Sequence, residues 1–259
     1  MKTLAAPAVA LAVAALAFPA AAQDAAEDWD LTVNAEQQLT LASLDFGANA
    51  MAIRCRAGMF DVLLTGVPVS TADARPARLT TGGIVDEIQV WTTQPGLPVI
   101  AAPEPARLAR QIRGGGVVDL RLEPATQGER AHRYRLTLPP STASIDRVLQ
   151  ACDRPLTNDR DLVQRLDPGA LTWRRQADIR FPETAGALNA GRGVVELSCI
   201  VSAEIRLTDC RAESETPAGV GFAESAIRGA EQAEFDAPGG AATVTGRIVH
   251  YTSRFTPPN

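Results

Sequence analysis

Cysteine placement constrains the fold of this chain more than any other feature of its sequence. The four cysteines are Cys55, Cys152, Cys199 and Cys210, and they include no Cys-x-x-Cys pair. Structural zinc sites are built from such close ligand pairs, and the chain offers only two histidines as further ligands. We therefore predict disulfide bonds and no metal site. Because four cysteines are too few for a disulfide scaffold of 259 residues, a hydrophobic core must supply most of the stability.

Hydrophobic periodicity favours one connectivity for the first two cysteines. Cys55 ends a run in which Met51 and Ile53 alternate with arginine, the pattern of a half-buried strand. Cys152 ends a run over residues 145–152 in which apolar side chains recur at helical spacing. Both sulfur atoms are therefore expected to point into one core, and we predict that Cys55 pairs with Cys152.

The other two cysteines lie in adjacent strand-like runs, residues 194–201 and 205–212. Two neighbouring strands of this length form a hairpin, which a Cys199–Cys210 bond would cross-link. We predict this second bond, so that each half of the chain contains one disulfide. A structural disulfide is typical of proteins that fold outside the reducing cytosol.

Residues 1–22 are predicted to be a cleaved export signal. Lys2 supplies the positive start, an Ala/Val/Leu-rich run follows over residues 4–18, and three alanines at 20–22 match the small-x-small cleavage pattern. The alternative is an inner-membrane anchor over residues 4–22, a stretch close to the ~20 residues that span a bilayer. Pro19 and the alanines favour cleavage. We expect a periplasmic protein, with membrane contact only if this segment is retained.

The charge composition excludes several classes of function. Lys2 is the single lysine among the 25 Lys and Arg residues, so chemistry that needs a P-loop lysine or a Schiff base is excluded from the mature chain. The net charge of −5 argues against nucleic-acid binding, which needs a basic surface. The sequence has no GxSxG, HExxH, SxxK or GxGxxG motif. We expect no enzymatic activity and no cofactor.

The chain divides into two predicted domains. The first covers residues 23–156 and has alternating, strand-like runs at 59–65, 86–92, 118–122 and 134–138, with helices expected over 104–113 and 144–152, the latter capped by Ser144. Residues 157–175 are polar and contain Pro168 and Gly169, which indicates a linker. The second domain covers residues 176–259. We expect an α+β protein, with an antiparallel β-rich domain followed by a three-stranded antiparallel sheet packed on helices.

The second domain carries an ordered set of landmarks. Phe181-Pro182 precedes a short helical run, and Gly193 leads into the first strand of the hairpin. Residues 214–217 (Ser-Glu-Thr-Pro) end the second strand, and an Ala-rich amphipathic helix is expected over 221–234. The pattern closes with residues 235–238 (Phe-Asp-Ala-Pro) and a strand over 246–255. In this order and spacing the region resembles the C-terminal domain of the TonB family of periplasmic energy transducers, in a cysteine-containing variant.

This resemblance implies a binding mode. In the family, the last strand of the sheet offers an unpaired edge to a short extended segment of an outer-membrane receptor, which adds to the sheet as a further strand. The corresponding residues here are Arg247, Ile248, Val249, His250, Tyr251, Thr252, Ser253, Arg254 and Phe255. The resemblance therefore predicts a protein partner, either a TonB-dependent receptor or another envelope component.

Two alternatives remain open at this stage. A true energy transducer would retain residues 4–22 as an anchor and carry a long Pro- and Lys-rich arm, whereas this chain has a globular domain in that place. An anion- or small-ligand-binding protein would use an arginine-rich face of the first domain, formed by Arg54, Arg56, Arg121, Arg133 and Arg135. The first domain is also similar, loosely, to small periplasmic β-domains of the invasion-associated and type VI accessory kind.

Overall fold

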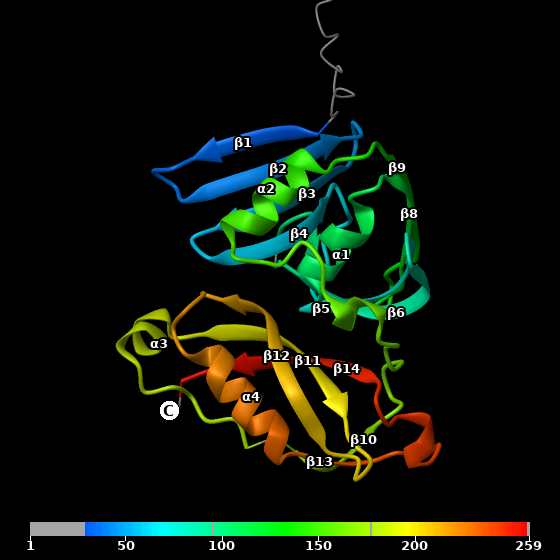
Figure 1. The fold of residues 1–259 in the computed structure, drawn as a ribbon, viewed down its shortest axis with the longest axis vertical. Helices are drawn as coiled ribbons and strands as arrows, with labels where there is room; N and C mark the ends of the chain where they lie inside the picture. Colours follow the sequence, from blue (N-terminus) through cyan, green and yellow to red (C-terminus); the bar gives the residue numbers. More distant parts are fainter. Residues whose placement is uncertain (1–28, 95, 177, 258–259) are drawn as a thin grey trace, which may run out of the picture.

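The computed structural model describes residues 29–94, 96–176 and 178–257 (Figure 1). The predicted export signal, residues 1–22, lies outside the described residues. The described chain forms two stacked units, one built from the first half of the sequence and one from the second. Each unit has its own cluster of buried hydrophobic side chains. The predicted domain boundaries at residues 156 and 176 stay predictions.

A nine-stranded antiparallel sheet forms the first unit, in the order β1-β2-β3-β4-β7-β6-β5-β8-β9. Its strands are β1 (Asp30–Asn34), β2 (Leu39–Asp45), β3 (Ala50–Arg56), β4 (Met59–Thr65), β5 (Ala74–Thr81), β6 (Ile84–Thr93), β7 (Val99–Ala101), β8 (Gly116–Leu122) and β9 (His132–Leu138). Two helices, α1 (Pro105–Ile112) and α2 (Ala143–Ala151), pack on the sheet.

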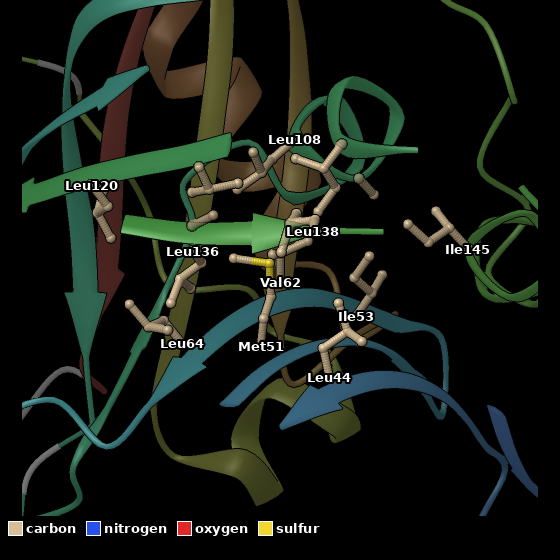
Figure 2. Close-up of a cluster of buried hydrophobic side chains, with 14 of the residues drawn as sticks. Leu44, Met51, Ile53, Val62, Leu64, Leu108, Leu120, Leu136, Leu138 and Ile145 are labelled. Atoms are coloured by element: carbon tan, nitrogen blue, oxygen red, sulfur yellow. The ribbon is translucent and has the colours of Figure 1, made fainter. Parts of the chain in front are cut away.

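Alternation of apolar and polar residues explains how this sheet builds its core. Successive side chains of a strand point to opposite faces, so every second residue of β2, β3 and β5 is buried. Figure 2 shows side chains from strands and helices converging in one cluster, among them Leu44, Met51, Ile53, Val62, Leu64, Leu108, Leu120, Leu136, Leu138 and Ile145. The core therefore lies between the inner face of the sheet and the two helices.

A three-stranded antiparallel sheet in the order β12-β11-β14 forms the second unit. Its strands are β11 (Gly193–Val201), β12 (Leu207–Thr216) and β14 (Ile248–Phe255), and α4 (Phe222–Gln232) crosses one face of it (Figure 1). The remaining elements are α3 (Ala185–Ala190), the paired strands β10 (Thr172–Arg175) and β13 (Glu234–Asp236), and the 3-10 helices η1 (Asp159–Leu162) and η2 (Ala241–Thr243). Gly193 is required where the helix meets the sheet, because a Cβ there would overlap the Phe222 ring.

Both predicted disulfide bonds are confirmed. Cys55 pairs with Cys152, which joins β3 to the end of α2, and Cys199 pairs with Cys210 between β11 and β12. Two structural disulfides indicate that the protein folds in an oxidising compartment. Within the described residues, no helix combines the length and the apolar character needed to cross a membrane.

The predicted α+β class is wrong. Strands make up 42% of the described residues and helices 18%, and a single large antiparallel sheet dominates, so the protein belongs to the β-rich class. One physical reason lies in β5, a central strand that contains a proline. Proline is normally excluded from central strands because it lacks an N–H group. Pro76 nevertheless lies in β5, between β6 and β8, and its carbonyl oxygen accepts a hydrogen bond from the Glu123 N–H at 2.8 Å.

The start of α2 also differs from the prediction. Thr142, not Ser144, is the residue at the N-cap position, and the helix begins at Ala143. Ser144 is buried inside the first turn, where its hydroxyl donates to the Trp29 carbonyl oxygen at 3.4 Å. The serine therefore anchors the N-terminal end of the described chain to the helix instead of capping it.

Candidate functional site

The strand β14 lies at an edge of the C-terminal sheet. It pairs with β11 along its whole length, from the pair Ile248–Ile200 to the pair Phe255–Gly193. On its other side, a single bridge joins it to the segment between the two units: the Ile248 N–H donates to the Gln164 carbonyl at 2.9 Å, and the Leu166 N–H donates to the Ile248 carbonyl at 2.7 Å. Beyond Leu166, no further backbone hydrogen bond joins this segment to β14 among the described residues.

Backbone geometry identifies which groups of β14 remain open. Backbone N–H and C=O groups alternate between the two sides of an antiparallel strand. Because Ile248 directs its groups outward, His250, Thr252 and Arg254 direct theirs outward as well. Among the described residues, no strand or loop forms backbone hydrogen bonds with these three residues on that side. Six backbone polar groups of β14 are thus oriented to receive another strand.

Most residues of the predicted binding strand belong to β14. Arg247 alone precedes it, and its carbonyl oxygen accepts from the Val201 N–H at 3.0 Å. The side chains alternate between two faces of the sheet. One face, toward α4, holds Val249, Tyr251, Ser253 and Phe255, which lie opposite residues of β11 that contact the helix. The opposite face holds Ile248, His250, Thr252 and Arg254.

A pocket of about 320 Å³ surrounds the open edge of β14. It is bounded by residues 249–252 of β14, by residues 87–90 of β6 in the other unit, and by residues 165–169 of the connecting segment. Because it includes residues from both faces of β14, the pocket has two chemically different sides. We call it the interdomain slot.

Carboxylates line one side of the interdomain slot, and Glu196 on β11 is the least satisfied of them. The residue is 5% exposed, Thr252 donates a hydrogen bond to its Oε2 at 2.8 Å, and its Oε1 has no hydrogen-bond partner among the described residues. Burial raises the pKa of the Glu196 carboxyl, an effect that the hydrogen bond from Thr252 and the charges of Arg254 and His250 only partly oppose.

Glu104, next to the first turn of α1, is the second carboxylate and links the two units. Its side chain is 5% exposed and lies 2.6 Å from Arg165 Nη2, 2.9 Å from Arg107 Nη1 and 3.0 Å from His250 Nε2. Burial alone would raise the pKa of Glu104, but His250 and Arg165 beside it hold that pKa well below its usual range. Glu104 is therefore ionised and fully engaged in ion pairs.

Aromatic side chains line the other side of the slot. Trp173 on β10 stacks on Phe235 of β13 with ring centroids 4.4 Å apart, and it meets Tyr251 of β14 edge-on at 6.0 Å. Trp173 keeps 45% of its surface exposed, whereas the other two described tryptophans, Trp29 and Trp91, are buried. An exposed indole beside an open strand edge is a typical contact surface for a protein partner.

The strand β6 offers a second open edge to the same slot. It pairs with β5 along most of its length, but β7 covers only Thr92 and Thr93 on the other side. Pro76, opposite Val90, directs its carbonyl to β8, so Val90 and its alternate neighbour Ile88 direct their backbone groups away from β5. The slot therefore lies between two strand edges that have no strand partner among the described residues.

The predicted arginine face is not assembled in the structure. Arg54 lies on β3 and pairs with Asp61 at 2.6 Å, while Arg121 lies on β8 and Arg135 on β9, separated from β3 by four and five strands of the sheet. Arg133 pairs with Asp119 at 2.6 Å, and Arg121 pairs with Glu123 at 2.9 Å. The five arginines therefore do not form one face: Arg121, Arg133 and Arg135 lie together on the paired strands β8 and β9, whereas Arg54 and Arg56 lie apart on β3.

The described part of the chain brings together neither a set of metal-ligating side chains nor a free thiol. No cluster of three His, Cys, Asp or Glu side chains is placed to hold a metal ion there. His132 lies at the start of β9 and His250 in the slot, so the structure does not bring the two histidines together. All four cysteines are disulfide-bonded, which leaves no thiol as a nucleophile.

Comparison with known proteins adds no identification. No family model matches the chain, and no curated protein or solved structure gave a significant match. The resemblance to the TonB C-terminal domain is therefore untested by these comparisons, and function has to be argued from the site.

Proposed function

We propose that this protein binds, without catalysis, an extended segment of another envelope protein by strand addition to β14. The observation that carries the proposal is the open edge at His250, Thr252 and Arg254, which borders a pocket. Strand addition obtains affinity from main-chain hydrogen bonds and specificity from pockets for alternate side chains. The parallel bridge between Arg165 and Ile248 supports it, since a segment from outside the sheet already pairs with this edge at one residue.

The compartment and the partner form part of the same proposal. The two disulfides and the predicted signal at residues 1–22 are consistent with the periplasm. The resemblance to the TonB C-terminal domain points to the periplasmic segment of an outer-membrane receptor as the first partner to test. The open edge serves this function whether or not residues 4–22 anchor the protein to the inner membrane.

Proline substitution at Thr252 tests strand addition. Thr252→Pro removes an outward N–H without touching the hydrogen bonds to β11, and Thr252→Ala is the matched control, because both variants lose the hydroxyl that bonds Glu196. We expect receptor-derived peptides to bind the mature chain and the alanine variant similarly. We expect at least about tenfold weaker binding to the proline variant, from the lost hydrogen bond and the ring in the path of the added strand.

Nuclear magnetic resonance of the mature chain supplies the readout. The amide signals of His250, Thr252 and Arg254 should shift most during titration, because these outward N–H groups of β14 have no backbone partner among the described residues. If the proline and alanine variants bind equally well, or if the shifts lie elsewhere, strand addition to β14 is wrong.

A further inference from the structure

Resting on the proposed function, we propose that the interdomain slot selects an extended segment in which basic side chains alternate with apolar or aromatic ones. The juxtaposition that carries this inference is a carboxylate-lined face and an aromatic face on the two sides of one open strand edge. Neither face alone would select a sequence, but together they select a segment in which the two kinds of side chain alternate at every second residue.

The period follows from the geometry of a strand. Successive side chains of an added strand point to opposite faces of the sheet, and each lies beside the residue opposite it on β14. A side chain beside Thr252 or His250 enters the carboxylate side of the slot. Its neighbours along the added strand enter the side that holds Tyr251 and Trp173.

The carboxylate side calls for a cation. Four acidic residues line the slot, Glu87, Glu104, Asp167 and Glu196, against a single arginine, Arg165. Arg107 and Arg165 neutralise Glu87 and Glu104 through short ion pairs. Asp167 and Glu196 have no such ion-pair partner among the described residues. Glu196 is the decisive group, since only 5% of the residue is exposed and its Oε1 has no hydrogen-bond partner among the described residues.

A basic side chain on an added strand can reach Glu196. The carboxylate lies one strand in from the edge, beside Thr252, and both residues line the slot. Neighbouring strands are about 4.8 Å apart, so a long Lys or Arg side chain opposite Thr252 extends over the threonine to the carboxylate. The interaction would supply the partner that Oε1 lacks and would favour the charged form of Glu196.

The aromatic side calls for an apolar or aromatic side chain. Trp173 presents nearly half of its surface there, and the Tyr251 hydroxyl is buried without a hydrogen-bond partner among the described residues. Leu171 and Val249 complete this wall. Burying a further ring or branched side chain against these groups removes apolar surface from water, which favours binding.

Charge and burial identify a different protein as the occupant. The chain's own residues 23–28 contain three carboxylates and no basic residue, so their charge is wrong for the slot. A second copy would present Arg133 and Arg135 on its edge strand β9, but the residues that alternate with them, Tyr134 and Leu136, belong to or pack against that copy's own core. A basic, alternating segment of a partner protein satisfies both faces.

Three matched peptides test the inference on the mature full chain. The first alternates Arg with Val and Tyr, the second has the same composition with its arginines grouped at one end, and the third alternates but carries Gln in place of Arg. We expect the alternating Arg peptide to bind at least about tenfold more tightly than either of the others, the effect of one well-placed charged contact. Calorimetry gives the affinities, and amide shifts of β14 give the position.

Glu196→Gln separates the carboxylate from the rest of the slot. This variant should lose the preference for the Arg peptide over the Gln peptide while keeping its affinity for the Gln peptide. Glu183→Gln is the matched control, because Glu183 is exposed and lies outside the slot, so the same change in net charge should leave the preference intact.

The outcomes distinguish failure of the inference from failure of the proposed function. Equal affinity for the Arg and Gln peptides, with shifts in the β14 amides, overturns basic selection and leaves strand addition standing. Equal affinity for the alternating and grouped peptides reduces the effect to general attraction between charges. Tight binding of the Arg peptide without movement of the β14 amides overturns strand addition. If none of the three peptides binds the folded chain, the inference is wrong. It is also wrong if sedimentation shows that the slot is occupied only by a second copy of the chain, in a dimer.

Discussion

Glu196 is the residue at which the stability of the fold and the chemistry of the slot conflict. A carboxylate inside a protein loses its hydration, and the loss is tolerable only when hydrogen bonds or opposite charges replace the water. Thr252 supplies one hydrogen bond, and the other carboxylate oxygen has none among the described residues. A buried glutamate in this state is expected to cost the isolated protein stability.

Replacement of Glu196 by Gln should therefore stabilise the isolated protein at neutral pH. Because burial raises the pKa of Glu196 in the folded state, its protonated form is favoured there, and stability falls as the pH rises through that raised value. Gln mimics the neutral form, so the gain should be about 1 kcal/mol at neutral pH, or a melting temperature higher by about 2–4 °C. The gain should vanish below the pKa of an unfolded glutamate.

Thermal unfolding at several pH values checks this expectation, with Glu183→Gln as the control for a lost surface charge. If the Glu196→Gln variant is less stable than the parent at neutral pH, the Glu196 carboxylate is well satisfied in the isolated protein. The slot would then lack the unpartnered carboxylate that a basic side chain is expected to bind.

Single residues of the site were only partly predictable from the sequence. His250, Tyr251 and Thr252 could be named because they lie in the strand that corresponds to the binding edge of a resembling family. Glu196 was missed, although it and Ser198 interrupt an otherwise apolar strand and so mark a polar face. Glu104 and Trp173 were missed because they come from other elements, and only the tertiary fold brings them beside β14.

At the scale of elements, periodicity located strands that bury one face and missed those that do not. Strands β3, β4, β8 and β9 alternate clearly and were anticipated close to their observed bounds. The strand β10 is fully exposed and shows no apolar alternation, and β1 has only two alternate apolar residues, Leu31 and Val33, both of them exposed. The proline in β5 concealed a central strand. Each of these strands forms because its neighbours supply hydrogen bonds, a property that the local sequence does not contain.

The two disulfides should differ in how much they stabilise the elements that they join. Cys55 and Cys152 are 97 residues apart, whereas Cys199 and Cys210 are 11 apart within one hairpin. In the chain-entropy model a bond that closes the longer loop contributes about 4.7 kcal/mol and the shorter about 3 kcal/mol. Replacing Cys55 and Cys152 together by alanine should therefore lower the free energy of unfolding by about 2 kcal/mol more than replacing the other pair.

Urea unfolding of the two double variants measures this difference, and comparison of the denaturant slopes shows whether each variant still unfolds in one step. Equal losses, or a larger loss for the hairpin disulfide, would mean that the contribution comes from packing around the sulfur atoms and not from loop closure.

At the scale of the whole molecule, buried arginines connect the two units. Arg160 bonds Ser198 and Asp209 of the second unit, Arg110 bonds Asp161, and Arg165 bonds Glu104 of the first unit. Residues 157–175 were expected to be a linker, because neither a pattern nor a spacing in the sequence shows which charges will be desolvated. In the structure this segment is bonded to both units and lines the slot through residues 165–169.

Arg165 should therefore control the rigidity of the slot. Its guanidinium contacts both oxygens of Glu104, and it also donates to the Arg160 carbonyl at 2.7 Å, so it joins the connecting segment to the first unit. Arg165→Gln leaves the buried Glu104 with Arg107 and His250 alone, and breaking a buried ion pair costs about 3 kcal/mol. We expect faster hydrogen exchange at residues 87–90 and 249–252, with the core strand β3 unaffected. Arg133→Gln removes an exposed pair and should change exchange little, as surface pairs contribute about 0–1 kcal/mol. If the two variants behave alike at the slot, the buried ion pair does not hold the units together, and the width of the slot is set by apolar packing instead.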